Sequence, residues 1–130
     1  MMPKKYRIDR IEDITTISFT AAPTFDEAKE VIGVLKEKNI YHLRLWDFSS
    51  VLFDFDTEEI QQIANYGKLT FTEKNRIAMV APQDSAYGTL RMFEVYREQN
   101  SFSIARVFRT KAEAMQWLEE QKVLLASEPV

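Results

Sequence analysis

Residues 76–85 of the chain read RIAMVAPQDS, and this stretch decides the fold class. Its first part, Arg76 to Ala81, is a nearly continuous apolar run, which is typical of a strand near the centre of a parallel sheet. Pro82 ends that strand, and the turn after it leads into a helix with apolar residues at helical spacing. The stretch therefore predicts a strand-turn-helix unit of an α/β domain.

Helices are predicted on both sides of this unit by three capping boxes, in which a Ser, Thr or Asp is followed three residues later by Glu. The pairs are Thr24 with Glu27, Asp56 with Glu59, and Thr110 with Glu113. Apolar residues at helical spacing follow each pair. We expect the first helix to end at Asn39 and the second at about Leu69.

Strands are predicted by alternating residues from Lys5 to Thr20, with a tight turn at Glu12 and Asp13, and again from Tyr41 to Phe48 and from Phe102 to Phe108. The order is β-β-α-β-α-β-α-β-α. We predict one α/β domain over residues 1–130, with an open, mostly parallel five-stranded sheet, an N-terminal antiparallel hairpin and a frayed tail from about residue 125. Crossovers of one hand put the helices mainly on one face.

Composition excludes several classes of protein. A formal net charge of −3 argues against a nucleic-acid partner, which needs clustered Lys and Arg. No apolar run approaches the roughly 20 residues that span a bilayer, so we expect no membrane insertion. The absence of Cys fits a reducing compartment and excludes thiolate chemistry. We therefore expect a cytoplasmic protein.

A family resemblance lies in the middle and last thirds of the chain. Two parts of the sequence carry it. The first is residues 47–54, which read DFSSVLFD, and the second consists of residues 76–81, 86–88 and 107–118. These segments resemble STAS (SpoIIAA-like) domains and small bacterial proteins related to them. The resemblance implies a non-enzymatic regulatory domain that binds another protein. In the antagonists of that family a serine after an Asp is phosphorylated, but residues 54–58 here read DFDTE. The phosphorylation switch therefore transfers to no residue.

A candidate ligand site follows from the rule that ligands bind beyond the carboxyl ends of the strands in open α/β sheets. Carboxylates and hydroxyls there could hold Mg²⁺ beside a phosphate, although helix capping explains several of them and is the favoured interpretation. We expect no metal and no cofactor. The candidate residues are Asp47, Ser49, Asp54, Asp56, Asp84, Ser85, Tyr87 and Arg109.

Catalysis is not indicated. His42 is the single histidine, no Cys is present, and no glycine-rich phosphate loop occurs. We name no catalytic residue and expect no enzyme. The alternative to a protein-interaction domain is a small-ligand-binding domain with a pocket at the carboxyl ends of the strands.

A candidate dimer interface lies on one face of the strand from Tyr41 to Phe48, which carries His42, Arg44, Trp46 and Phe48. Aromatic residues with Arg are typical of interface cores. If the crossovers leave this face uncovered, a second copy of the chain would cover it, and we predict a homodimer. The alternative is that Trp46 and Phe48 are partly buried under a helix of a neighbouring layer.

Overall fold

The computed structural model describes residues 5–53, 55–97 and 103–127. Its elements follow the predicted order. The strands are β1 (Tyr6–Ile11), β2 (Ile14–Phe19), β3 (Leu43–Asp47), β4 (Asn75–Val80) and β5 (Ser103–Phe108). The helices are α1 (Phe25–Lys38), α2 (Thr57–Thr70), α3 (Asp84–Arg97) and α4 (Lys111–Ser127).

The strands form one sheet in the order β1-β2-β3-β4-β5. β1 pairs antiparallel with β2, and the remaining pairs are parallel. The hairpin turns at Glu12 and Asp13, whose φ angles of 51° and 72° lie in the left-handed region that two-residue hairpin loops require. The predicted α/β fold with an N-terminal hairpin is therefore confirmed.

The predicted capping boxes begin three of the helices. In α1 and α2 the side chain of Thr24 or Asp56 accepts from the backbone three residues on, and the Glu side chain accepts from the cap backbone in return. α1 ends at Asn39, which adopts a left-handed conformation with φ 56° and donates its N–H to the last turn of the helix. Local sequence thus sets both ends of this helix.

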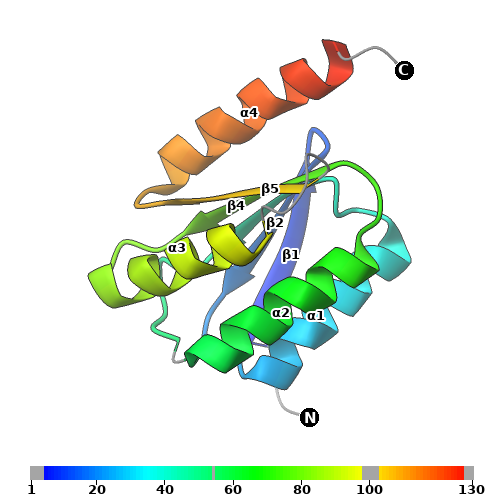
Figure 1. The fold of residues 1–130 in the computed structure, drawn as a ribbon. Coiled ribbons are helices and arrows are strands. Elements are labelled where there is room, and N and C mark those ends of the chain that lie inside the picture. Colours follow the sequence, from blue (N-terminus) through cyan, green and yellow to red (C-terminus); the bar gives the residue numbers. More distant parts are fainter. Residues whose placement is uncertain (1–4, 54, 98–102, 128–130) are drawn as a thin grey trace.

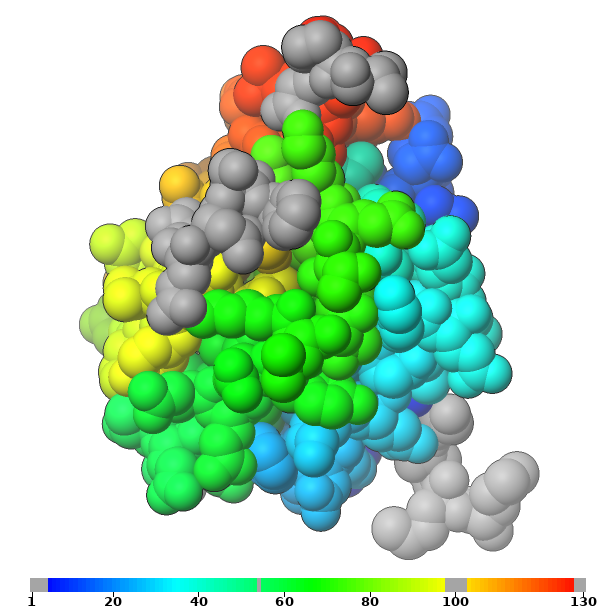
Figure 2. Space-filling model, turned by 45° about the vertical axis from the view of Figure 1, so that its right-hand side comes forward, coloured from blue at the N-terminus to red at the C-terminus, as the bar shows by residue number. Residues whose placement is uncertain are grey.

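Helices α1, α2 and α3 cover one face of the sheet, and α4 lies on the other (Figure 1). α1, α2 and α3 pack side by side on the first face, with α2 in the middle, and their outer surface is seen in Figure 2. α4 packs on β3, β4 and β5 from the opposite side. The expectation that the helices lie mainly on one face is right for α1 to α3. None of the described helices is long and apolar enough to cross a membrane.

Two apolar cores result from this layering. The larger core lies between the sheet and α1 to α3 and includes Ile17, Trp46 and Ile77. The smaller core lies under α4 and includes Leu45 and Leu118. The part of the second face that α4 leaves uncovered belongs to β1 and β2, where Arg7 and Asp9 are exposed and Thr16 is half-buried.

The predicted dimer interface is wrong, because the structure buries it inside the monomer. Trp46 is 9% exposed and Phe48 is 5% exposed, and both belong to the larger core. Arg44 is 2% exposed. His42 is half-buried just before β3, with its Nε2 atom 3.1 Å from Glu73 Oε2.

The register between β2 and β3 explains why this face lies in the core. Ile17 is the neighbour of Trp46, and Thr16 is the neighbour of Leu45. The apolar side chains Ile17 and Phe19 therefore share a face with Trp46 and Phe48, and not with Leu45. Phe19 stacks on Trp46 of β3 and on Phe48, which directly follows β3, with ring centroids 5.8 Å and 4.9 Å away.

Replacing Trp46 with Ala should therefore destabilise the monomer and should not merely weaken an association. Removal of a buried aromatic side chain of this size lowers the free energy of unfolding by about 3–5 kcal/mol. Urea denaturation of Trp46→Ala would measure the loss. Trp117→Ala is the matched control, because Trp117 on α4 is half-buried and its truncation should cost less. Equal losses in the two variants would contradict the placement of Trp46 in the core.

Candidate functional site

Six of the predicted site residues lie at or just after the carboxyl ends of β3, β4 and β5: Asp47, Ser49, Asp84, Ser85, Tyr87 and Arg109. Asp47 at the end of β3 lies beside Val80 of β4, and Val80 lies beside Phe108 of β5. The segments that follow these three strands therefore lie along one edge of the sheet. We call this edge, formed by residues 47–53, 82–88 and 109, the strand-end rim.

The first part of the rim consists of contacts within one loop. The Asp47 carboxylate accepts hydrogen bonds from the backbone N–H of Ser49, at 2.9 Å, and from the Ser49 hydroxyl. Asp56 caps α2 by accepting from the backbone N–H of Glu59 at 2.8 Å. Asp54 lies outside the described residues. The structure thus gives Asp47 and Asp56 local structural roles.

The second part of the rim is held together by Arg109. Its Nη1 atom donates to the Asp84 carboxylate at 2.6 Å and to the Pro82 carbonyl at 3.0 Å. Its guanidinium lies over the ring of Tyr87, 4.1 Å from the centroid. Ser85 is exposed in the first turn of α3. In the described ranges no three acidic or histidine side chains come together to hold a metal ion.

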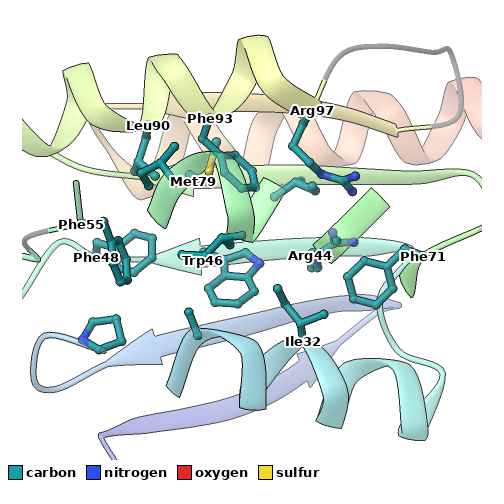
Figure 3. A pocket seen from close by; sticks show the side chains of 16 residues that line it. Ile32, Arg44, Trp46, Phe48, Phe55, Phe71, Met79, Leu90, Phe93 and Arg97 are labelled. Carbon is teal, nitrogen blue, oxygen red and sulfur yellow. The ribbon is translucent and has the colours of Figure 1, made fainter. Parts of the chain in front are cut away.

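A cavity of about 40 Å³ lies elsewhere, between the sheet and helices α1 to α3. Its walls are mostly apolar, and Figure 3 shows the side chains that line it. Phe48 and Phe55 lie at one end, Trp46 in the middle, and Arg44, Phe71 and Arg97 at the other end. The cavity therefore has an aromatic end and a cationic end.

The cationic end contains two buried guanidinium groups. Arg44 comes from β3 and is 2% exposed, and Arg97 is the last residue of α3 and is 1% exposed. Burial lowers the pKa of Arg97 to about 10. Burial also lowers the pKa of Arg44 well below its ordinary value, and the charge of Arg97 adds to that shift. Arginine still keeps its charge at neutral pH.

Neutral groups hold both guanidiniums in place. Arg44 Nη1 donates to the Tyr41 carbonyl at 2.6 Å and to Asn75 Oδ1 at 3.1 Å. Arg97 Nη2 donates to the Ser103 hydroxyl at 2.7 Å, and that hydroxyl donates to the same Asn75 oxygen at 3.0 Å. Phe71 stacks on the Arg44 guanidinium at 4.2 Å. Asn75 and Ser103 thus connect the two cations without adding a negative charge.

No carboxylate within residues 5–53, 55–97 and 103–127 forms an ion pair with Arg44 or Arg97. The Nε atoms of both side chains are buried and have no hydrogen-bond acceptor within those ranges. Buried charges are normally paired, because an unpaired one is costly to remove from water. The cationic end of the cavity therefore departs from this rule within the described structure.

Sequence reasoning missed this site for two reasons. Arg44 was grouped with Trp46 correctly, but that face was interpreted as an external interface. Arg97 carries no signal of its own, because a basic residue in the last turn of a helix is expected from the helix dipole. The available signal was an arginine between Leu43 and Leu45 in a strand that also carries Trp46.

Comparison with known proteins identifies the fold. No family model and no curated protein matches the sequence. A solved structure does match, that of a "putative anti-sigma factor antagonist" from Thermotoga maritima, with a TM-score of 0.60. The alignment covers 88% of this chain and 94% of that chain, at 15% sequence identity. The chain has a STAS-like fold. The resemblance found in the sequence is thus confirmed for the fold.

We predict that the buried guanidinium of Arg97 lowers the free energy of unfolding of the protein. Replacing Arg97 with an apolar side chain of similar size removes a buried charge that has no counter-charge among the described residues, and with it the cost of taking that charge out of water. We expect Arg97→Met to raise the melting temperature and the free energy of unfolding, measured by thermal and urea denaturation. Arg91→Met, on the same helix but at an exposed position, should give no gain. A loss of stability in Arg97→Met would show that the guanidinium has a stabilising partner.

Proposed function

We propose that the protein is a non-enzymatic regulatory domain that acts by binding another protein in the bacterial cytoplasm. The observation that carries the proposal is the fold shared with a putative anti-sigma factor antagonist over 88% of this chain and 94% of that one. Proteins that share a fold can differ in function, so the site must agree with the proposal.

The arrangement of polar side chains supports a role without catalysis. A nucleophile-base relay needs its members within hydrogen-bond reach. His42 precedes β3 and contacts Glu73, whereas Ser49 and Ser85 follow β3 and β4 at the opposite end of these strands. Asp84 is engaged by Arg109, and Asp47 by Ser49. These contacts give the carboxylates structural partners and support a binding function.

The surface that we assign to the partner is the strand-end rim after β3. Leu52 is 56% exposed there, close in sequence to the exposed hydroxyls of Ser49 and Ser50. An apolar side chain with polar neighbours on a loop at a strand end suits protein recognition. A homodimer stays part of the proposal, but its interface must be a surface other than the buried Trp46 face.

A photo-crosslinking residue at position 52 tests this assignment in cells that produce the protein. We expect a crosslinked product from position 52 and much less from position 69, because Leu69, which is 74% exposed, lies at the other end of α2. Sedimentation of the purified protein would show whether the product is a second copy of the chain or another protein. Equal yields at the two positions, or none at either, would contradict the rim as the docking surface.

A turnover assay tests the second half of the proposal. The purified protein should not hydrolyse esters, phosphate monoesters or nucleotides above the rate of buffer alone. Turnover that is lost in Asp47→Ala or Asp84→Ala would show that the rim is an active site.

A further inference from the structure

The cationic end of the cavity lacks a negative charge that the described part of the chain could supply. Two guanidiniums are buried beside Asn75 and Ser103, and the groups that contact them within the described part of the chain are neutral. Each Nε still has its N–H to donate. An anion placed there would receive charge-assisted hydrogen bonds, which are about twice as strong as neutral ones.

The two arginines are also held in position before any ligand arrives. Phe71 covers one face of the Arg44 guanidinium, and hydrogen bonds from Nη1 to Tyr41 and Asn75 fix its orientation. Gly67 of α2 lies against the Arg97 guanidinium, where a Cβ atom would be 3.5 Å from Cζ. Positions fixed in advance lower the entropy cost of binding. The cationic end is thus organised in the way that recognition of an anion requires.

The apolar part of the cavity determines what kind of group the anionic end of a ligand can be attached to. Beyond the arginines the lining is apolar, with Trp46, Met79, Leu90 and Phe48 in sequence toward the aromatic end. A phosphate or sulfate would need donors on all sides, and this lining has none to offer away from the two arginines. A carboxylate carries its charge on one end and can attach it to an apolar body.

Cavity size limits the length of that body. A volume of about 40 Å³ is more than one water needs, but less than the roughly 150 Å³ that admits benzene. Phe55 and Phe93 are half-buried, whereas the other lining side chains that form the core are buried. An apolar chain of a few carbon atoms therefore fits only if the rings of Phe55 and Phe93 move, and a long chain would fit only if the helices separated.

We infer that the cavity between the sheet and α1 to α3 binds a short-chain carboxylate, with its carboxylate on Arg44 and Arg97 and its apolar body beside Trp46. The arginines that would hold the carboxylate lie at the end of the cavity away from the strand-end rim, which shares only Phe48 with the cavity wall, and binding there does not require the partner proposed for the rim. Ligand binding and partner binding can therefore fail independently.

The wild-type protein and a panel of probes test the inference. Butyrate, hexanoate and dodecanoate vary the chain length, hexan-1-ol removes the charge, and inorganic phosphate removes the apolar body. Isothermal calorimetry measures affinity, and the emission of Trp46 in a Trp117→Phe protein reports occupancy beside the cavity wall. We expect butyrate or hexanoate to bind at least about tenfold more tightly than hexan-1-ol, since a hydrogen bond to a charged group is worth that factor or more.

Substitutions of Arg97 then test whether its guanidinium binds the carboxylate. Arg97→Met should weaken hexanoate binding by at least about tenfold while the fold stays intact, and Arg91→Met on the same helix should leave it unchanged. Arg97→Lys keeps the charge but loses the planar fork, so it should bind with intermediate affinity. If Arg97→Met does not fold, the hexanoate affinity of Arg97→Lys tests the role of Arg97 instead.

Three results would overturn the inference. The first is that no carboxylate binds to the wild-type protein or changes the Trp46 emission. The second is that hexan-1-ol or phosphate binds as tightly as hexanoate, which would remove the need for either the charge or the apolar body. The third is that dodecanoate binds more tightly than the shorter acids, which would assign a long-chain lipid to the cavity.

Discussion

The parallel pairing of β2 with β3 places Ile17 beside Trp46, and the rest of the structure depends on this register. Side chains alternate between the faces of a sheet, so a shift of one residue would exchange the two faces of a strand. With the observed register, the aromatic side chains of β2 and β3 point to the same side and stack there. α1, α2 and α3 cover that side, and α4 covers the aliphatic residues on the other.

The same register brings Arg44 into the interior. Arg44 shares the face of Trp46 and Phe48, so any layer that covers the aromatic rings must cover the guanidinium too. The structure accommodates it with hydrogen bonds to neutral groups and with the ring of Phe71. Arg97 reaches the same place from the end of α3. Two like charges in one apolar layer oppose folding, and a bound anion would offset this cost.

The charged side chains of the strand-end rim and those of the cavity differ in their exposure and in their partners. At the rim, the charged side chains are exposed and already have partners, as in the pair of Arg109 with Asp84. Exposed pairs of this kind contribute little to stability and leave the surface open to a docking protein. In the cavity, the charges are buried and lack a counter-charge from the described residues. The rim suits a protein partner, whereas the cavity suits a small anion.

The sequence by itself determined the elements and their order, because caps, turns and alternation act over a few residues. Thr24 with Glu27, Asp56 with Glu59, and the turn at Glu12 and Asp13 all have the geometry that these short patterns require. Only the tertiary structure decided which faces share a core and where Arg44 and Arg97 meet. These two residues are 53 positions apart in the sequence, and their proximity depends on strand register and helix packing, which no local pattern encodes.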